Sequence, residues 1–118
     1  MYITGKNFIG EKLSGLGKVN YKTIDPLKNI ENKTLFLEAT PEELEEAIAL
    51  ADSAFPIYRA LSGAQRAIFL NTIADEILNL GDALIDIYCR ETGLPQGRAI
   101  GERGRTIFQL QLFAKTIE

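Results

Sequence analysis

The sequence has 118 residues, 46% of them apolar and 25% charged, with a formal net charge of −3. This length suits one small apolar core, and the composition is that of a globular chain, so a disordered or collagen-like protein is excluded. Nucleic-acid binding needs a basic face, which the acidic balance does not favour.

Cysteine and histidine usage excludes further classes. The sequence contains Cys89 as its one cysteine and no histidine. An internal disulfide, the usual zinc ligand sets and a Ser-His-Asp or Cys-His centre are therefore impossible within these residues, and no metal site is expected. Neither a signal peptide nor an apolar run long enough to span a bilayer is present, so we expect no membrane partner and a cytoplasmic location.

The first 39 residues have the pattern of short strands. Residues 2–4 and 8–10 predict a hairpin that turns at 5–7, and residues 19–24 alternate apolar and polar residues as a half-buried strand does. Asp25-Pro26 ends that strand by turn chemistry, and residues 34–38 predict a further strand. Residues 1–39 are thus expected to form a strand-rich arm.

Residues 40–118 predict helices. The first begins with Thr40 as cap and Glu43 at the capping-box position, presents an apolar face and ends or bends at Pro56. Ser62 and Gln65 form a second capping box, followed by an apolar stripe made of Ala67, Leu70, Ile73, Ala74 and Ile77.

Two further helices are expected after this stripe. Gly81-Asp82 interrupts the pattern with Asp82 as a cap, and the next helix stops at Gly93 before Pro95. A last helix runs from about Gln96 to the end of the sequence, where no cap, glycine or turn follows. This abrupt end suggests that the natural chain continues, although a frayed terminal helix is the alternative.

The order of these features resembles the N-terminal part of the aldehyde dehydrogenase superfamily. In that superfamily a turn such as Asp25-Pro26 precedes a helix ending in Ala-Phe, here Ala54-Phe55. A Ser-x-x-x-Arg helix start follows, here Ser62 to Arg66, and then a turn similar to Glu91-Thr92-Gly93-Leu94-Pro95. The segment Gly101–Thr106, with Gln109, Leu110 and Phe113, resembles the branch that oxidises 2-oxoglutarate semialdehyde to 2-oxoglutarate.

The resemblance implies an α/β fold for the complete enzyme. These residues would be the N-terminal part of its Rossmann-type cofactor domain, and the isolated chain would be α+β, mainly helical with short N-terminal strands. The arm and the helical segment would together make one incomplete domain. The complete enzyme would use NAD or NADP, but its nucleophilic cysteine, general base and cofactor-binding residues lie beyond position 118. We therefore expect this chain to be inactive alone and to bind no cofactor.

Individual residues allow weaker functional hypotheses. Arg103, Thr106 and Gln109 follow one another at i, i+3 spacing, and the resemblance places this helix at the mouth of the substrate tunnel. There Arg103 or Arg105 would suit a carboxylate substrate. The alternative is a solvated or helix-packing face. Cys89 is expected to be structural, because it lies in the last turns of a helix without histidine.

Two other groups also have a structural explanation that is simpler than a functional one. The pair Gly101 and Gly104 could cradle a phosphate only after a strand, which the sequence does not predict; close helix packing or room for substrate are the alternatives. The acidic group from Glu42 to Glu46 is best explained by the helix dipole.

The rival hypothesis is a stand-alone helical interaction module. The enzyme hypothesis predicts that the helices expose apolar faces meant for a sheet that is absent, so that the isolated chain self-associates and the rest of the enzyme chain is its natural partner. A module would seal those faces with its own residues.

Overall fold

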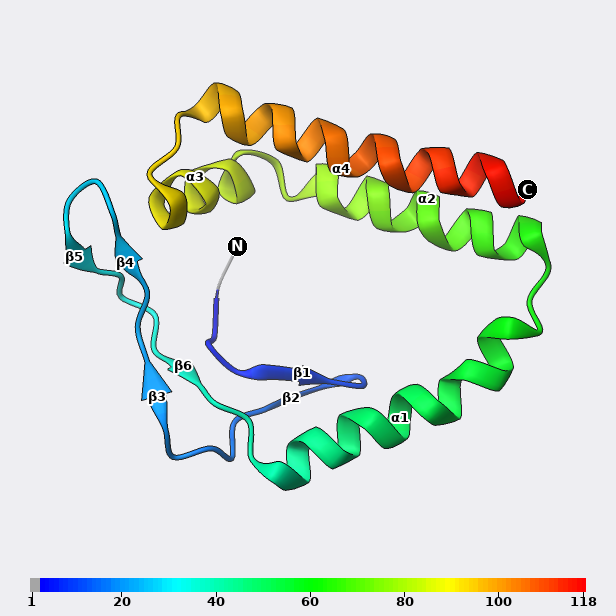
Figure 1. Cartoon of the computed structure of the whole chain (residues 1–118), viewed down its shortest axis with the longest axis horizontal. Coiled ribbons are helices and arrows are strands. Elements are labelled where there is room, and N and C mark those ends of the chain that lie inside the picture. The colour runs from blue at the N-terminus through cyan, green and yellow to red at the C-terminus, as the bar shows by residue number, and fades with distance from the viewer. Residues whose placement is uncertain (1–2) are drawn as a thin grey trace. The chain divides into compact units, whose positions relative to one another are not determined.

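The computed structural model describes residues 3–118 and consists of four helices and six short strands (Figure 1). The strands are β1 (Asn7–Ile9), β2 (Lys12–Ser14), β3 (Asn20–Tyr21), β4 (Ile24–Asp25), β5 (Ile30–Glu31) and β6 (Phe36–Leu37). The helices are α1 (Pro41–Arg59), α2 (Gly63–Asn79), α3 (Gly81–Thr92) and α4 (Gln96–Ile117). The expectation of a mainly helical chain with short N-terminal strands is confirmed.

The chain forms two compact units. One contains Asp25–Lys28 and Ala60–Glu118, and the other contains the described residues up to Ile24 together with Asn29–Arg59. The predicted boundary near Ala39 falls inside the second of these units, since α1 groups with the strands. Each unit is described by itself below.

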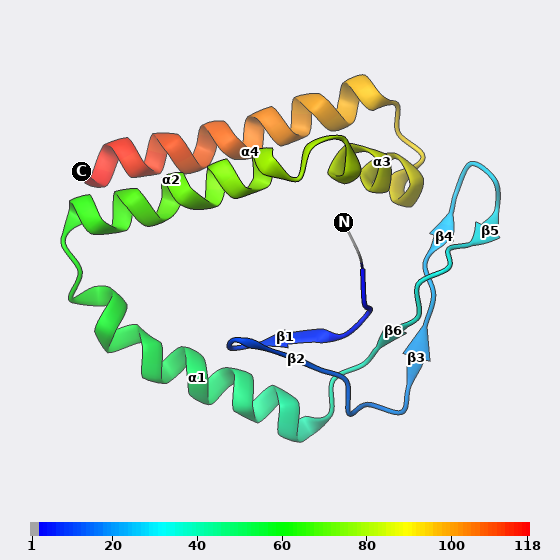
Figure 2. The same cartoon turned by 180° about the vertical axis from the view of Figure 1, so that it is seen from behind.

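In the unit that contains α1, the N-terminal hairpin lies alongside this helix (Figure 2). The hairpin pairs Asn7 with Ser14 and Ile9 with Lys12, so its turn is at Gly10-Glu11 and the predicted turn at 5–7 is wrong. Gly10 has φ +58°, at a position where tight hairpin turns favour glycine. The expected first strand is absent at residues 3–4, and Tyr2 lies outside the described residues.

Gly5 has a different role from the predicted turn. Its carbonyl accepts a hydrogen bond of 3.0 Å from the N–H of Leu37, and its φ is +72°. A Cβ atom at Gly5 would lie 1.9 Å from the carbonyl oxygen of Leu35, so the two backbones approach too closely for any other residue. The glycine thus permits a contact between segments that are distant in sequence.

The predicted strand over residues 19–24 is shorter and more exposed than expected. It is divided into β3, which pairs with β6, and β4, which pairs with β5, a strand that the sequence analysis missed. Tyr21 and Phe36 stack across β3 and β6 with ring centroids 5.6 Å apart. Tyr21 is nevertheless 52% exposed, so the expectation of a half-buried strand is wrong.

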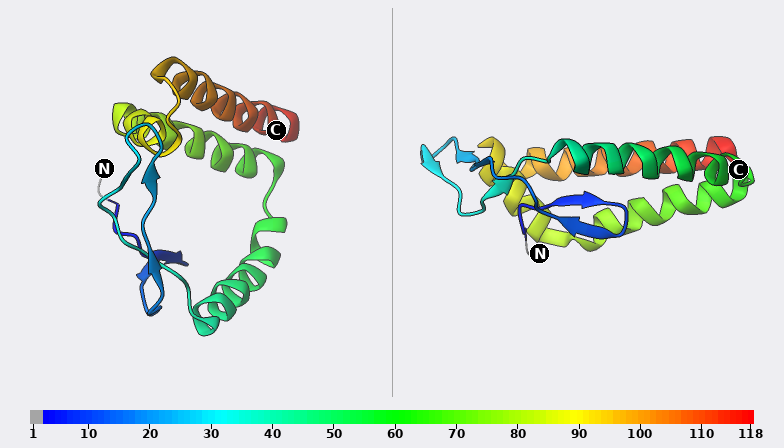
Figure 3. Two further views of the ribbon diagram at one scale, coloured as in Figure 1. Left: turned by 60° about the vertical axis from the view of Figure 1, so that its left-hand side comes forward. Right: turned by 90° about the horizontal axis from the view of Figure 1, so that it is seen from below.

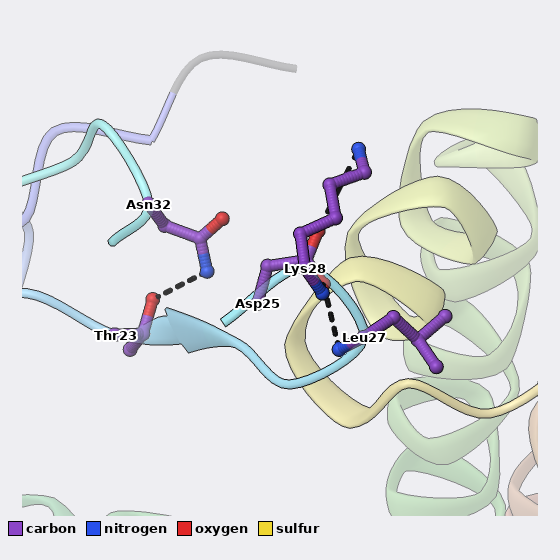
Figure 4. Close-up of polar contacts among 5 residues, drawn as sticks. All are labelled: Thr23, Asp25, Leu27, Lys28 and Asn32. Carbon is purple, nitrogen blue, oxygen red and sulfur yellow. Dashed lines mark hydrogen bonds and ion pairs between the residues drawn. The ribbon is translucent and has the colours of Figure 1, made fainter. Parts of the chain in front are cut away.

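The Asp25-Pro26 turn has the expected chemistry (Figure 4). Oδ1 of Asp25 accepts hydrogen bonds from the N–H groups of Leu27 at 3.0 Å and Lys28 at 3.2 Å, which close the turn after β4. Nearby in the chain, Nδ2 of Asn32 donates to Oγ1 of Thr23 at 3.0 Å.

Helix α1 begins as predicted. An end or a bend was expected at Pro56, and the helix does not end there. The N–H of Glu43 donates to Oγ1 of Thr40, and the N–H of Thr40 donates to Oε2 of Glu43, which completes the capping box. Pro56 removes one backbone donor near the end of the helix, and α1 continues to Arg59.

Helices α2 and α4 form the core of the other unit and lie side by side in all views (Figures 1 to 3). They run antiparallel, since a Cβ atom at Gly63, where α2 begins, would lie 1.9 Å from the carbonyl oxygen of Ile117, where α4 ends. The buried apolar residues of these two helices are Ala67, Ala74, Ala99, Ile107 and Ala114. Small side chains here permit close packing of the two helices.

The boundaries of α2 and α3 follow their caps. The capping box of Ser62 and Gln65 is present at the start of α2, as predicted. Gly93 ends α3 with φ +70° and donates its N–H to the carbonyl of Cys89, also as predicted. The prediction that Asp82 caps α3 is wrong, because α3 already begins at Gly81, which places Asp82 in its first turn.

The buried carboxylate of Glu43 fixes the residues after β2 to the start of α1. The side chain is 1% exposed, and its Oε1 accepts from the N–H of Leu16 at 3.2 Å. Hydrogen bonds from the Ser14 side chain and the Thr40 N–H, helped by the Leu16 N–H and the charge of Lys12, lower the pKa of Glu43 from its ordinary 4.5, against the opposing effect of burial.

This lowered pKa predicts a pH dependence of stability. A carboxyl group whose pKa is lower in the folded state stabilises the fold above its unfolded-state pKa, and loses this effect as the pH falls through its folded-state pKa. We expect the free energy of unfolding to fall on acidification below about pH 4.5. In Glu43→Gln this fall should be smaller; urea titrations at several pH values measure it. The matched control Glu45→Gln, exposed on the same helix, should keep the full pH dependence.

Candidate functional site

The candidate site lies on helix α4, because the expected tunnel residues are there. An open hollow of about 460 Å³ follows one side of this helix, lined by Glu102, Arg105, Thr106, Gln109, Leu110 and Phe113. Thr106 and Gln109, two of the three expected residues, thus lie at one surface, and both side chains are exposed.

Arg103, the third expected residue, does not line the hollow. Its Nη1 donates a hydrogen bond of 3.2 Å to the carbonyl of Gly81, the first residue of α3. The side chain is half-buried and ties α4 to α3. Three residues rotate by about 300° around a helix, which is about 60° short of a full turn. After two such steps, Arg103 and Gln109 therefore point roughly 120° apart.

Arg105 supplies the cation that lines the hollow. The sequence analysis named it beside Arg103 as an arginine that would suit an acidic substrate, but did not place it on one face with Gln109. Arg105 and Gln109 are four residues apart, a spacing that keeps two side chains closer to one face than two steps of three do. This i, i+4 spacing is the sequence signal that could have indicated that Arg105 and Gln109 line the same surface. Phe113 continues the same series with a ring that is 58% exposed.

Glu102, the acidic residue of the hollow, is paired. Its Oε1 accepts from Nη2 of Arg98 at 2.8 Å and from Nε of the same guanidinium at 3.0 Å, one turn earlier on the helix. This pairing offsets the negative charge of Glu102 and leaves Arg105 as the unmatched charge of the hollow. The surface therefore combines a cation, two hydrogen-bonding side chains and an apolar end, which suits a small anion with an apolar part.

Thr106 also bonds within its own helix. Its hydroxyl donates to the carbonyl of Glu102 at 3.0 Å, so its lone pairs remain able to accept a hydrogen bond. Gln109 can both donate and accept through its amide. Gln109 can therefore donate a hydrogen bond to a carboxylate or a carbonyl group, whereas Thr106 in this arrangement can only accept one.

The glycine pair of α4 does not form a phosphate cradle. Gly101 and Gly104 lie inside the helix, and the preceding element is helix α3, so the strand and loop that a cradle needs are missing from these residues. A Cβ atom at either position would meet no described atom within 4 Å. Close packing against the described residues therefore does not require glycine at these two positions.

Cys89 and the acidic group from Glu42 to Glu46, the other candidates, lie where a structural role explains them. Cys89 is a free, half-buried residue in the second half of α3. Glu43 of the acidic group is buried by its capping role, whereas Glu42, Glu45 and Glu46 are exposed.

Among residues 3–118 no three His, Cys, Asp or Glu side chains gather into a metal-binding group. None of the helices in this range combines the length and apolar content of a bilayer-spanning segment.

The role of Arg103 in joining two helices can be tested by substitution. Arg103→Met removes the donor to the Gly81 carbonyl, and we expect a loss of about 1 kcal/mol in the free energy of unfolding. Arg105→Met, on the exposed side of the same helix, should change it by less than about 0.5 kcal/mol. Urea denaturation of the two variants compares them directly; equal losses would contradict the assignment.

Comparison with known proteins identifies close relatives of this chain. The sequence model of the aldehyde dehydrogenase family matches residues 17–118. The chain is 44% identical over 118 residues to alpha-ketoglutaric semialdehyde dehydrogenase 2 of Azospirillum brasilense, covering 99% of this chain and 22% of that protein. It is 37% identical over 113 residues to alpha-ketoglutaric semialdehyde dehydrogenase of Acinetobacter baylyi, covering 96% of this chain and 22% of that protein. The chain thus spans about a fifth of the length of these relatives.

Proposed function

The chain belongs to the aldehyde dehydrogenase family, and we propose that it is the N-terminal part of an enzyme that oxidises 2-oxoglutarate semialdehyde to 2-oxoglutarate. The observation that carries this proposal is the similarity over almost the whole chain to two alpha-ketoglutaric semialdehyde dehydrogenases. The hollow on α4 supports it, because a cation and hydrogen-bonding side chains lie beside an apolar surface.

The complete enzyme would use NAD or NADP, as the family resemblance implies. It would form a thiohemiacetal on a cysteine outside this segment and pass hydride to the nicotinamide. Residues 1–118 would be inactive alone, because the nucleophile, the general base and the cofactor-binding residues belong to the rest of the chain. The two compact units would become parts of one Rossmann-type domain, and the single cysteine favours a reducing, cytoplasmic location.

The role of α4 would be to border the substrate tunnel. We assign Thr106 and Gln109 to the binding of the substrate, with Arg105 beside them in the hollow. Arg103, which does not line the hollow, would lie at the margin of the tunnel. A guanidinium group matches a carboxylate in a two-pronged geometry, so an acidic aldehyde would bind better than a neutral one.

This assignment predicts a change in substrate preference in the complete enzyme. Arg105→Met should raise KM for the acidic aldehyde by about tenfold, the size of one charge-assisted hydrogen bond, while KM for a neutral aldehyde of similar length stays within about twofold. Arg103→Met should have a smaller effect of the same kind. Steady-state kinetics with the two aldehydes measures it. Equal effects on both substrates would show that the arginines support the helix and do not select the substrate.

The exposed apolar side chains of α1 also support the proposal. Leu44, Ile48 and Phe55 recur at helical spacing and are 56%, 54% and 60% exposed, while the buried residue of this helix is the acid Glu43. A stand-alone module would cover such a face, because large exposed apolar patches mark binding surfaces or drive aggregation.

We therefore expect the isolated 118-residue chain to self-associate. Its apparent mass in sedimentation equilibrium should rise with concentration, and it should bind a dye that reports apolar surface. Ile48→Gln should weaken this association, whereas Ala49→Gln, an exposed change roughly 100° around the same helix, should not. A monomer that binds little dye would support the alternative of a stand-alone interaction module.

A further inference from the structure

Helix α4 has a third surface, which neither packs on α2 nor lines the hollow. We call this surface the glycine face; its five exposed residues are Gly97, Gly101, Gly104, Phe108 and Leu112. At about 100° per residue, these positions lie within roughly 80° of one another around the helix. The buried residues Ala99, Ile107 and Ala114 point at least roughly 120° away from Gly101, so α2 covers a different side of α4.

The described residues give no reason for glycine on this face. Gly101 and Gly104 do not have positive φ, and α4 continues through both of them. A Cβ atom at either position, or at Gly97, would meet no atom within 4 Å among residues 3–118. Glycine is a poor helix former, because ordering its backbone costs more conformational entropy than ordering that of any other residue. Alanine at these positions would therefore make the isolated helix more stable.

Large apolar side chains continue the face where the glycines end. Phe108 is 61% exposed and Leu112 is 47% exposed, one and two turns after Gly104. Lys115, close to the end of the helix, is the first charged residue on this line. Glycine allows another backbone to approach a helix closely, and exposed apolar side chains mark a surface that a partner covers. The face thus has the shape for a segment that lies against the glycines and meets Phe108 and Leu112 with apolar side chains.

The length of the relatives indicates which segment this is. The chain spans 22% of each of the two relatives, so most of such an enzyme lies outside these residues. On the basis of the proposed function, we propose that the glycine face is the docking surface for a segment of the same polypeptide that follows residue 118. The backbone of this segment crosses Gly101 and Gly104, and its apolar side chains cover Phe108 and Leu112.

The small size of the face favours this occupant over a second copy of the chain. A stable interface between separate proteins uses roughly 20 to 30 residues on each side. Five residues of one helix, three of them glycine, offer much less. A segment of the same polypeptide can bind so small a surface, because the connecting chain gives it a high effective concentration.

The test compares Gly101→Ala in the complete polypeptide and in the 118-residue chain, where the effects should have opposite signs. In dilute samples of the 118-residue chain, Tm should rise by about 2 °C or more, because alanine favours the helix and its Cβ atom meets nothing. In the complete polypeptide, Tm should fall by at least about 3 °C, because the added atom collides with the docked backbone. A change of the same sign in both chains would overturn the docking role.

Phe108→Ala provides a second variant, which removes volume and cannot block docking by a collision. It should lower the Tm of the complete polypeptide by at least about 3 °C, and that of the 118-residue chain by less than about 2 °C. It carries the test if Gly101→Ala does not fold in the complete polypeptide. The matched control is Asn71→Ala, exposed on α2, which favours the helix without touching the face and should raise Tm in both chains.

Two further measurements separate the docking role from its alternatives. Sedimentation of complete Gly101→Ala should give the same mass as the unsubstituted polypeptide; dissociation into smaller species would assign the face to a second copy and overturn the proposal. Aldehyde oxidation with NAD(P) by the unsubstituted complete polypeptide tests the proposed function. An active enzyme without opposite signs for Gly101→Ala overturns the docking role alone, and an inactive polypeptide with opposite signs overturns the function alone.

Discussion

Close packing of α2 on α4 through small side chains organises the unit that contains them. Ala67 and Ala74 of α2, and Ala99 and Ala114 of α4, are each at most 4% exposed. Alanines in such an interface let the helix axes approach to the short end of the usual range, so backbone and side chain are in contact over the length of both helices. Arg103 then links α4 to the beginning of α3, which makes the position of α3 depend on the same pair.

In the other unit, α1 reverses the usual distribution of polar and apolar residues. Its acid Glu43 is buried and its large apolar residues are exposed, because the carboxylate is satisfied by backbone N–H groups while no described element covers Leu44 or Ile48. A buried carboxylate is stable only when it is hydrogen-bonded. The exposed residues are then expected to be covered by a larger assembly, which fits a chain that spans about a fifth of its relatives.

The sequence predicted several helix boundaries that depend on residues within four positions of one another, although the cap at Asp82 was wrong. The caps at Thr40 and Ser62 and the stop at Gly93 are of this kind, and each was confirmed. The predictions of the strands were wrong where pairing between distant residues decides the structure. The carbonyl of Gly5 accepts a hydrogen bond from the N–H of Leu37, so Gly5 is not part of a hairpin turn. Short strands with few side chains carry too little periodicity to specify register.

On α4, the prediction of the candidate site was also affected by a contact between residues that are distant in sequence. A spacing of three residues placed Arg103, Thr106 and Gln109 in one series, but only the last two line the hollow. Arg103 is turned towards the carbonyl of Gly81, the first residue of α3, which has φ +56° where α2 gives way to α3. That acceptor is 22 residues away in sequence, and no local pattern identifies it.

The contacts of Glu43 have a consequence for where this chain can be shortened. The match to the aldehyde dehydrogenase family model begins at residue 17, yet two groups that bind this carboxylate, the Ser14 hydroxyl and the Leu16 N–H, precede that point. A protein trimmed to the matched region would keep the acid and lose two of the three hydrogen bonds to it, those from Ser14 and Leu16. An expression boundary for α1 is therefore better set before β1 than at residue 17.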